Sequence, residues 1–276
     1  MDFTFKRIYK GQIKMVVLDW AGTTMDYGCY APAVVFIEVF KNKGVAITME
    51  QARRPMGLHK REHIRAISKQ DEVAALWQTV HGRPVTDADV EAMFADFQPL
   101  QMACLADYAD LIPGALDAVA ALREKGILIG STTGYFTEAM ELLKSEAAAR
   151  GYTPDNSVCA TEVPAGRPEP WMVLKNMFDL GIYPPEAVVK VDDTKPGISE
   201  GLNAGTWTIG LAKTGNEVGL NYEEVNALAP EALEPLVAKA RLELAKMGAH
   251  YVVDSIVEVP AVVEDINMRL ARGERP

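Results

Sequence analysis

Continuous runs of apolar residues predict the strands of a buried parallel sheet. The first run lies in 13–19, and similar strand segments lie in 127–134, 187–194 and 206–212. A strand that helices cover on both faces has such a run, whereas a half-exposed strand alternates apolar and polar residues. Helical segments separate the later runs, among them 114–125, which is followed by a glycine. This second part of the chain therefore has the pattern of repeated βαβ units.

About eighty residues after the first strand show a different pattern, with almost no strand signal. Apolar residues at helical spacing predict helices over 31–44, 59–68, 72–82 and 86–97. Thr48 and Gln51 resemble a capping box, although Met56 and Gly57 soon interrupt the segment that follows. The region is therefore predicted to be helical throughout.

These two patterns predict an α/β protein with a Rossmann-like parallel-sheet core and an inserted helical cap. We expect the core to comprise residues 1–26 and 107–276 and the cap to comprise residues 27–106. Near the end of the chain, residues 230–253 predict one long helix followed by a strand at the sheet's edge. A chain of 276 residues that is 49% hydrophobic is long enough to bury one large core and an accessory domain.

Composition and charge limit the partners and the compartment. A net charge of −10 disfavours nucleic acid as a partner and means that an anionic substrate needs a local positive site. The chain has no run of 18 apolar residues and no apolar stretch typical of a signal peptide, so we expect a cytoplasmic protein without a membrane span. Its three cysteines, Cys29, Cys104 and Cys159, are scattered and odd in number, which argues against a disulfide framework.

Polar residues with metal- and phosphate-binding chemistry follow the predicted core strands. Asp19 follows the first strand, Ser131 to Thr133 follow the second, and Asp192 and Asp193 follow the third, with Arg167 in a loop between them. Parallel strands end at the same edge of a sheet, so these groups are expected to converge. Carboxylates bind Mg²⁺, hydroxyl groups hold phosphate oxygens, and arginine balances their charge. Each residue alone is explained equally well as a helix cap or a turn, but four in this order are not.

The order of these motifs resembles that of the haloacid dehalogenase superfamily, and more closely the phosphonoacetaldehyde hydrolase (phosphonatase) family. The matching segments are DWAGTTMDYGCYAP, RRPMGLHKREHIRA, GSTTGY, VPAGRPEPWM and NAGTWTIG. They extend over nearly the whole chain, cap included. Many phosphate-transferring enzymes have a second aspartate two residues after the first as an acid and base, and Ala21 holds that place here.

The resemblance implies a reaction in which this second aspartate is dispensable. In the implied mechanism Lys60 forms a Schiff base with phosphonoacetaldehyde, and Asp19 attacks phosphorus to give an aspartyl phosphate. The products are acetaldehyde and phosphate, in the breakdown of 2-aminoethylphosphonate. The family also implies a Mg²⁺ site formed by Asp19, the main-chain carbonyl of Ala21, and Asp193, and a homodimer.

A Schiff-base lysine must be partly neutral near pH 7, so Lys60 needs burial or cationic neighbours. Basic residues lie close to it in the chain, namely Arg53, Arg54, His59, Arg61 and His63. If 59–68 is helical, His63 lies on the same face as Lys60 and is a candidate to move protons. Without the resemblance, a solvated basic helix face is the better explanation of this segment.

Further residues match the family's substrate site. The resemblance assigns substrate contacts to Cys29, Met56, Gly57, Ser131, Thr133, Tyr135 and Arg167. Cys29 is not expected to act as a nucleophile, because no activating group lies near it in the sequence.

One position departs from the superfamily pattern. Many members have an acidic residue about four positions after the metal-binding aspartate, where this chain has Gly197. Either Asp192 or water takes that role, and the alignment favours Asp193 over Asp192 as the metal ligand.

Two other functions are compatible with this fold. One is a phosphatase or phosphomutase of the same superfamily that acts on a small phosphate ester, although Ala21 argues against it. The other is a regulatory binding module without turnover, against which the intact Asp19, Lys60, Arg167 and Asp193 argue.

Overall fold

A computed structural model describes residues 8–276 and contains one central parallel sheet. Its strands lie in the order β3-β2-β1-β4-β5-β6, and every neighbouring pair is parallel. The strands are β1 (Met15–Leu18), β2 (Leu128–Thr133), β3 (Asn156–Cys159), β4 (Val188–Asp192), β5 (Trp207–Leu211) and β6 (Tyr251–Val253). The predicted edge strand is confirmed as β6, whereas the first strand is shorter than the predicted 13–19.

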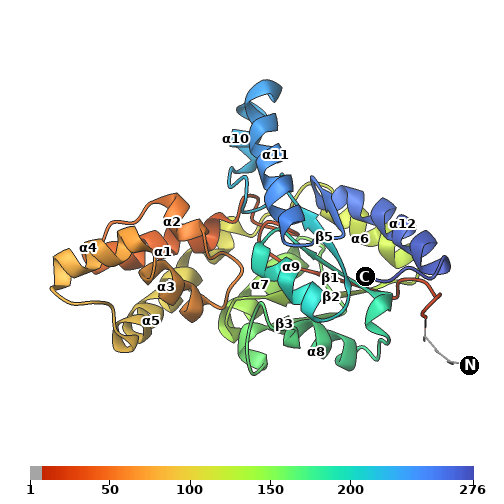
Figure 1. The fold of residues 1–276 in the computed structure, drawn as a ribbon, viewed down its shortest axis with the longest axis horizontal. Coiled ribbons are helices and arrows are strands. Elements are labelled where there is room, and N and C mark those ends of the chain that lie inside the picture. The colour runs from red at the N-terminus through yellow and green to blue at the C-terminus, as the bar shows by residue number, and fades with distance from the viewer. Residues whose placement is uncertain (1–7) are drawn as a thin grey trace, which may run out of the picture.

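Helices cover both faces of the sheet and form a separate lobe at one end of it (Figure 1). The lobe contains α1 (Tyr30–Asn42), α2 (Met49–Arg53), α3 (Lys60–Ser68), α4 (Asp71–His81) and α5 (Asp87–Cys104). The remaining helices are α6 (Ala115–Glu124), α7 (Thr137–Ala149), α8 (Trp171–Asp179), α9 (Lys195–Asn203), α10 (Tyr222–Ala227), α11 (Pro230–Lys246) and α12 (Val259–Ala271). Short 3₁₀ turns lie at Leu105–Tyr108, Ala160–Glu162, Pro185–Ala187 and Ile256–Glu258.

The α/β fold with added helices confirms the predicted fold class. In the text below, the lobe of α1–α5 is called the cap. The exact boundaries between cap and core stay a prediction, and residues 1–7 of the predicted first core segment lie outside the described residues. Between residues 8 and 276, no helix combines the length and the apolar character that crossing a bilayer requires.

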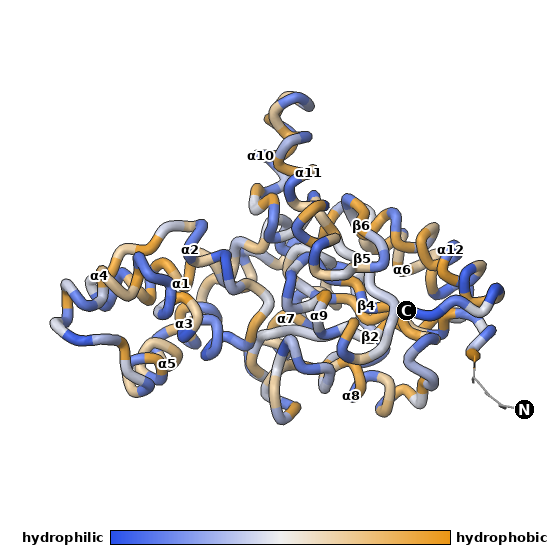
Figure 2. Tube along the Cα trace, in the orientation of Figure 1, coloured by the Kyte–Doolittle hydropathy of each residue, from blue (hydrophilic) through white to orange (hydrophobic). Residues whose placement is uncertain are grey.

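Strand β1 is apolar throughout because both of its faces are buried. Val16 and Leu18 pack into the large cluster that also contains Leu122 of α6, while Val17 packs with Val173 of α8 on the opposite face. Figure 2 shows hydrophobic residues around β2 and β4, whereas hydrophobic and hydrophilic residues alternate along α12. This is the physical reason for the continuous apolar runs in the sequence.

The register of the sheet brings the strand ends level with each other. Leu18 of β1 lies opposite Ser131 of β2 and Val191 of β4. The next residues along these strands, namely Asp19, Thr132 and Asp192, therefore lie level with one another at the carboxyl edge of the sheet. Ligands bind at this edge in open α/β sheets.

Candidate active site

Three buried aspartates meet at the carboxyl edge of the sheet. One carboxylate oxygen each from Asp19, Asp192 and Asp193 lies within 4.8 Å of the other two. Asp19 follows the last residue of β1, and its main-chain N–H donates to the carbonyl of Val191 at 3.1 Å. The convergence predicted from the strand ends is therefore present.

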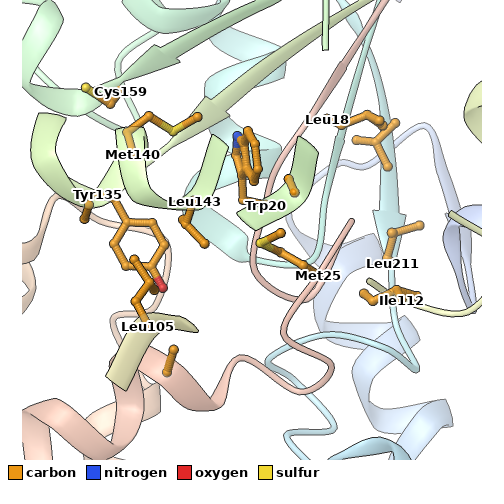
Figure 3. Packing of buried hydrophobic residues seen from close by; sticks show 14 of the residues in the cluster. Leu18, Trp20, Met25, Leu105, Ile112, Tyr135, Met140, Leu143, Cys159 and Leu211 are labelled. Atoms are coloured by element: carbon orange, nitrogen blue, oxygen red, sulfur yellow. The ribbon is translucent and has the colours of Figure 1, made fainter. Parts of the chain in front are cut away.

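The loop after Asp19 folds tightly against these carboxylates. The carbonyl of Trp20 accepts three main-chain hydrogen bonds, from residues 23, 24 and 25. Gly22 has a φ of 80°, and a Cβ at this position would lie 2.3 Å from Oδ2 of Asp193, so only glycine fits. Figure 3 shows Trp20 and Met25 inserted among buried side chains. Hydrophobic packing on one side thus holds the loop whose other side forms the site.

Arg167 connects the strand ends by several bonds. Its Nη2 donates to Oδ1 of Asp19 at 2.5 Å and to Oγ1 and the carbonyl of Thr132 at 2.8 and 3.0 Å. Its Nε donates to Oε2 of Glu200 at 3.0 Å, and Oδ2 of Asp192 lies 3.3 Å from Nη2. Burial alone lowers the pKa of Arg167, but these carboxylates raise it well above its usual value. Arg167 is therefore a fixed positive charge beside Asp19.

Lys190 and Glu200 complete this buried ion network, and sequence reasoning did not identify either. Nζ of Lys190 lies 2.8 Å from Oδ2 of Asp192 and 3.5 Å from Oε2 of Glu200, and both residues are fully buried. The available signal was a lysine in the middle of the apolar strand segment VVKV. A buried lysine without partners is costly, so such a residue points to buried carboxylates.

The charges of this network fit a divalent cation. Four carboxylates (Asp19, Asp192, Asp193 and Glu200) face two cations (Arg167 and Lys190), which leaves a net charge of −2 when all are ionised. Burial raises the pKa of Asp193 well above its usual value, and the negative charges of the two other aspartates raise it further. Burial also raises the pKa of Asp19. A divalent cation held by these carboxylates would offset that repulsion.

The cap places Lys60 over the aspartates. Lys60 is the first residue of α3, and its Nζ lies 4.4 Å from the centre of the Tyr135 ring. The pKa of Lys60 is lowered to about 8, chiefly by burial; the charge of Arg167 also lowers it, while the negative charges of Asp19 and Asp26 act in the opposite direction. The predicted burial of this amine is present. The main cationic contribution comes from Arg167 of the core and not from the basic residues beside Lys60 in the chain.

Cap and core enclose one small cavity of about 20 Å³, enough for roughly one water molecule. Its lining consists of Asp19, Ala21, Cys29, Pro32, Met56, Gly57, Lys60, Thr133, Gly134, Tyr135, Arg167 and Thr194. Most predicted site residues are thus together. Gly57 of the cap lies so close to the core that a Cβ there would lie 2.4 Å from Oγ1 of Thr194. The cap is therefore closed over the aspartates.

A family model and individual relatives both match this chain over most of its length. A family model of the haloacid dehalogenase-like hydrolases matches residues 13–205. The chain belongs to the haloacid dehalogenase-like hydrolases. It is 46% identical over 274 residues to "Phosphonoacetaldehyde hydrolase" of Nitratidesulfovibrio vulgaris, covering 99% of this chain and 98% of that protein. It is 48% identical over 267 residues to the protein of that name in Klebsiella pneumoniae, covering 96% of this chain and 99% of the relative.

Solved structures agree with this family assignment. A "phoshonoacetaldehyde hydrolase like protein" from Oleispira antarctica has a TM-score of 0.97, 39% identity and complete coverage of both chains. A hydrolase from Pseudomonas syringae has a TM-score of 0.68 and 16% identity, covering 92% of this chain and 99% of the other, and it supports the fold alone. Within the haloacid dehalogenase-like hydrolases, this chain is thus closely related to the phosphonoacetaldehyde hydrolases.

Three predicted site residues lie outside the lining of the cavity, namely Asp193, which belongs to the aspartate cluster, and His63 and Ser131. Nε2 of His63 lies 2.7 Å from the carbonyl oxygen of Ala52, and its ring stacks on Phe36 with centroids 3.8 Å apart. Burial lowers the pKa of His63 well below its usual value, and Lys60 lowers it further, so the ring is neutral. The role of His63 in proton transfer stays a prediction. Ser131 lies in the sheet, where its Oγ accepts from Nε1 of Trp20 at 3.0 Å.

Cys29 contacts a core aspartate rather than an activating base. Its thiol donates to Oδ2 of Asp193 at 3.2 Å. Burial raises the pKa of Cys29 well above its usual value, and the negative charge of Asp193 raises it further. A protonated thiol is a poor nucleophile, in agreement with the sequence-based expectation.

Proposed function

We propose that this hydrolase cleaves the P–C bond of phosphonoacetaldehyde to give acetaldehyde and phosphate. The observation that carries the proposal is that Lys60 and Asp19 line the same closed cavity, one from the cap and one from the core. A carbonyl group requires the amine, and a phosphonate group requires the carboxylate nucleophile. The names of the 46–48% identical relatives support the same substrate.

Lys60 provides the electron sink. With a pKa of about 8, roughly a tenth of this amine is neutral at pH 7. The neutral amine adds to the aldehyde carbon, and loss of water leaves a protonated imine. Its positive charge lies among negatively charged groups, since Asp19 and Asp26 both raise the pKa of Lys60.

Asp19 then displaces the carbon from phosphorus. Its carboxylate oxygen forms a bond to phosphorus while the electrons of the P–C bond move into the imine, which becomes an enamine. Water hydrolyses the aspartyl phosphate, and protonation and hydrolysis of the enamine release acetaldehyde and free Lys60. Because the leaving carbon is stabilised as an enamine, no second aspartate is needed at Ala21.

Asp19, Asp193 and the main-chain carbonyl of Ala21 are the groups that we assign to Mg²⁺. When bound, the ion supplies positive charge that offsets the repulsion between a phosphonate dianion and the attacking carboxylate. Arg167 holds Oδ1 of Asp19, which leaves the other oxygen of this carboxylate available for attack. Thr133, Gly134 and Arg167 line the same cavity and are assigned to the phosphonate oxygens.

We propose that the reaction serves the breakdown of 2-aminoethylphosphonate and that the enzyme is a homodimer. Both proposals follow from the resemblance to the phosphonatase family.

Phosphate release from a substrate panel tests the proposed function. We expect release from phosphonoacetaldehyde and none above background from sugar phosphates or other small phosphate monoesters. The reason is that among the described residues lining the cavity, Asp19 is the sole carboxyl group, so the second carboxyl group that would protonate an ester oxygen is lacking. Turnover of phosphate esters with phosphonoacetaldehyde inert would favour the phosphatase or phosphomutase alternative. Release from neither class would favour the binding module.

Removal of divalent metal is expected to lower turnover of phosphonoacetaldehyde by about 100-fold or more, since such charge stabilisation is worth several kcal/mol. The measurement is phosphate release after treatment with a chelator, with metal content determined by elemental analysis. Adding Mg²⁺ back serves as the control and restores activity. Full activity at a verified metal content near zero would contradict the assigned metal role.

A further inference from the structure

Gly197 and Asp192 compete for one position beside the aspartates. Gly197 lies in the first turn of α9, and a Cβ built there would lie 1.9 Å from Cγ of Asp192 and 2.0 and 2.1 Å from its two oxygens. No pair of non-bonded atoms approaches so closely. The carboxylate of Asp192 therefore occupies the space into which a side chain at position 197 would extend.

Hydrogen bonds to Oδ1 and ion pairs to Oδ2 hold the Asp192 carboxylate at this position. Its Oδ1 accepts from the main-chain N–H and from Oγ1 of Thr194 at 3.0 and 2.7 Å. Its Oδ2 lies 2.8 Å from Nζ of Lys190 and 3.3 Å from Nη2 of Arg167. Arg167 in turn donates to Oδ1 of Asp19. Asp192 thus contacts Asp19 through a shared arginine and lies beside the carboxylates of Asp19 and Asp193.

We propose that Asp192 is a positioning residue whose carboxylate, at the end of β4, takes the place of the acidic side chain that the resemblance to the superfamily implies at position 197. This arrangement requires glycine at position 197, because a side chain there would occupy the space of the Asp192 carboxylate. The inference rests on the metal site of the proposed function and adds to it the source of the charge that holds Arg167.

The geometry makes the two positions interchangeable. A side chain on residue 197 would begin at a Cβ that lies 1.9 Å from the present carboxyl carbon of Asp192. Its carboxyl group would begin one carbon–carbon bond beyond that Cβ, so its carboxyl carbon would lie within roughly 3.5 Å of the present one, in the region that Arg167 and Lys190 now contact. With glycine at 192, the space for that side chain is free. The exchange of the two residues is thus expected to preserve the network, whereas either change alone disrupts it.

Four variants test this exchange, with Mg²⁺ affinity by calorimetry and Tm as readouts that need no substrate. We expect Asp192→Gly to weaken Mg²⁺ binding by about tenfold or more, in the range found for groups that support metal ligands. Gly197→Asp alone is expected to lower Tm by on the order of 5–10 °C, because it places two carboxylates in one space. The double variant Asp192→Gly/Gly197→Asp is expected to recover Mg²⁺ affinity to within a few-fold of wild type.

The fourth variant, Asp192→Gly/Gly197→Ala, is the matched control for packing without charge. We expect it to be folded but to bind Mg²⁺ as weakly as Asp192→Gly. Equal affinity of this control and of the exchanged pair would overturn the proposal, and so would wild-type affinity in Asp192→Gly. If the glycine variants fail to fold, the isosteric Asp192→Asn takes their place, and unchanged Mg²⁺ affinity there also overturns it. A wild-type enzyme that binds Mg²⁺ but leaves phosphonoacetaldehyde intact contradicts only the proposed function.

Discussion

Replacing Asp19 by asparagine is expected to abolish phosphate release from phosphonoacetaldehyde while the fold stays intact. The amide has the shape of the carboxylate but cannot form an acyl phosphate, so the loss should be at least about 10⁴-fold, as for other covalent nucleophiles. Asp19 is buried and accepts from Arg167, and asparagine keeps an oxygen for that bond. Phosphate release gives the rate, and circular dichroism with Tm verifies the fold.

The control for Asp19→Asn is the same variant with Ala21→Asp. A carboxylate two residues away is not expected to replace the nucleophile, so this double variant should also be inactive. Near-native turnover of Asp19→Asn, with deamidation excluded by mass spectrometry, would show that the nucleophile lies elsewhere.

Reduction by borohydride in the presence of phosphonoacetaldehyde is expected to inactivate the enzyme irreversibly. Borohydride converts the imine on Lys60 to a stable secondary amine, and peptide mapping should find the added mass there. Because burial lowers the pKa of Lys60 to about 8, the neutral amine increases with pH. With the milder cyanoborohydride, the initial trapping rate should therefore rise from pH 6 and level off above about pH 8.

Lys60→Arg is the matched variant for this experiment, since arginine keeps the positive charge but is no amine nucleophile. It should lose both labelling and turnover, and borohydride without a carbonyl compound should leave the wild type active. A purely electrostatic lysine predicts no trapping and substantial activity in Lys60→Arg. Trapping on Lys43 or Lys69 would support the imine mechanism but show that Lys60 is not the residue that forms the imine.

The strands and the strand-end residues were predictable because they depend on local patterns. Continuous apolar runs indicated strands buried on both faces, and parallel order placed Asp19 and Asp193 at one edge. The capping box at Thr48 is present at the start of α2. Contacts between segments that are far apart in the sequence were harder to predict. Lys190 gave only the signal of a charge in an apolar strand, and Glu200 gave none, because its partner Arg167 lies 33 residues away.

The surroundings of Lys60 illustrate the same limit. Its helix was predicted from the apolar spacing in 59–68, and α3 begins at Lys60 itself. Helical spacing placed His63 on the same face, but the ring turns into the cap, where it contacts Phe36 and the carbonyl of Ala52. Side-chain direction depends on the partners that the tertiary fold supplies, and spacing within one helix does not contain them.

The closed cavity divides the two reactive groups between separate lobes, and this has a consequence for selectivity. A phosphate ester has a group for Asp19 but none for Lys60, and a simple aldehyde has the reverse. In the mechanism that we propose, only a molecule that bears both groups, one carbon apart, reacts with both lobes. Such an enzyme would distinguish its substrate from abundant metabolites by requiring two simultaneous attachments, so neither lobe would need to bind tightly on its own.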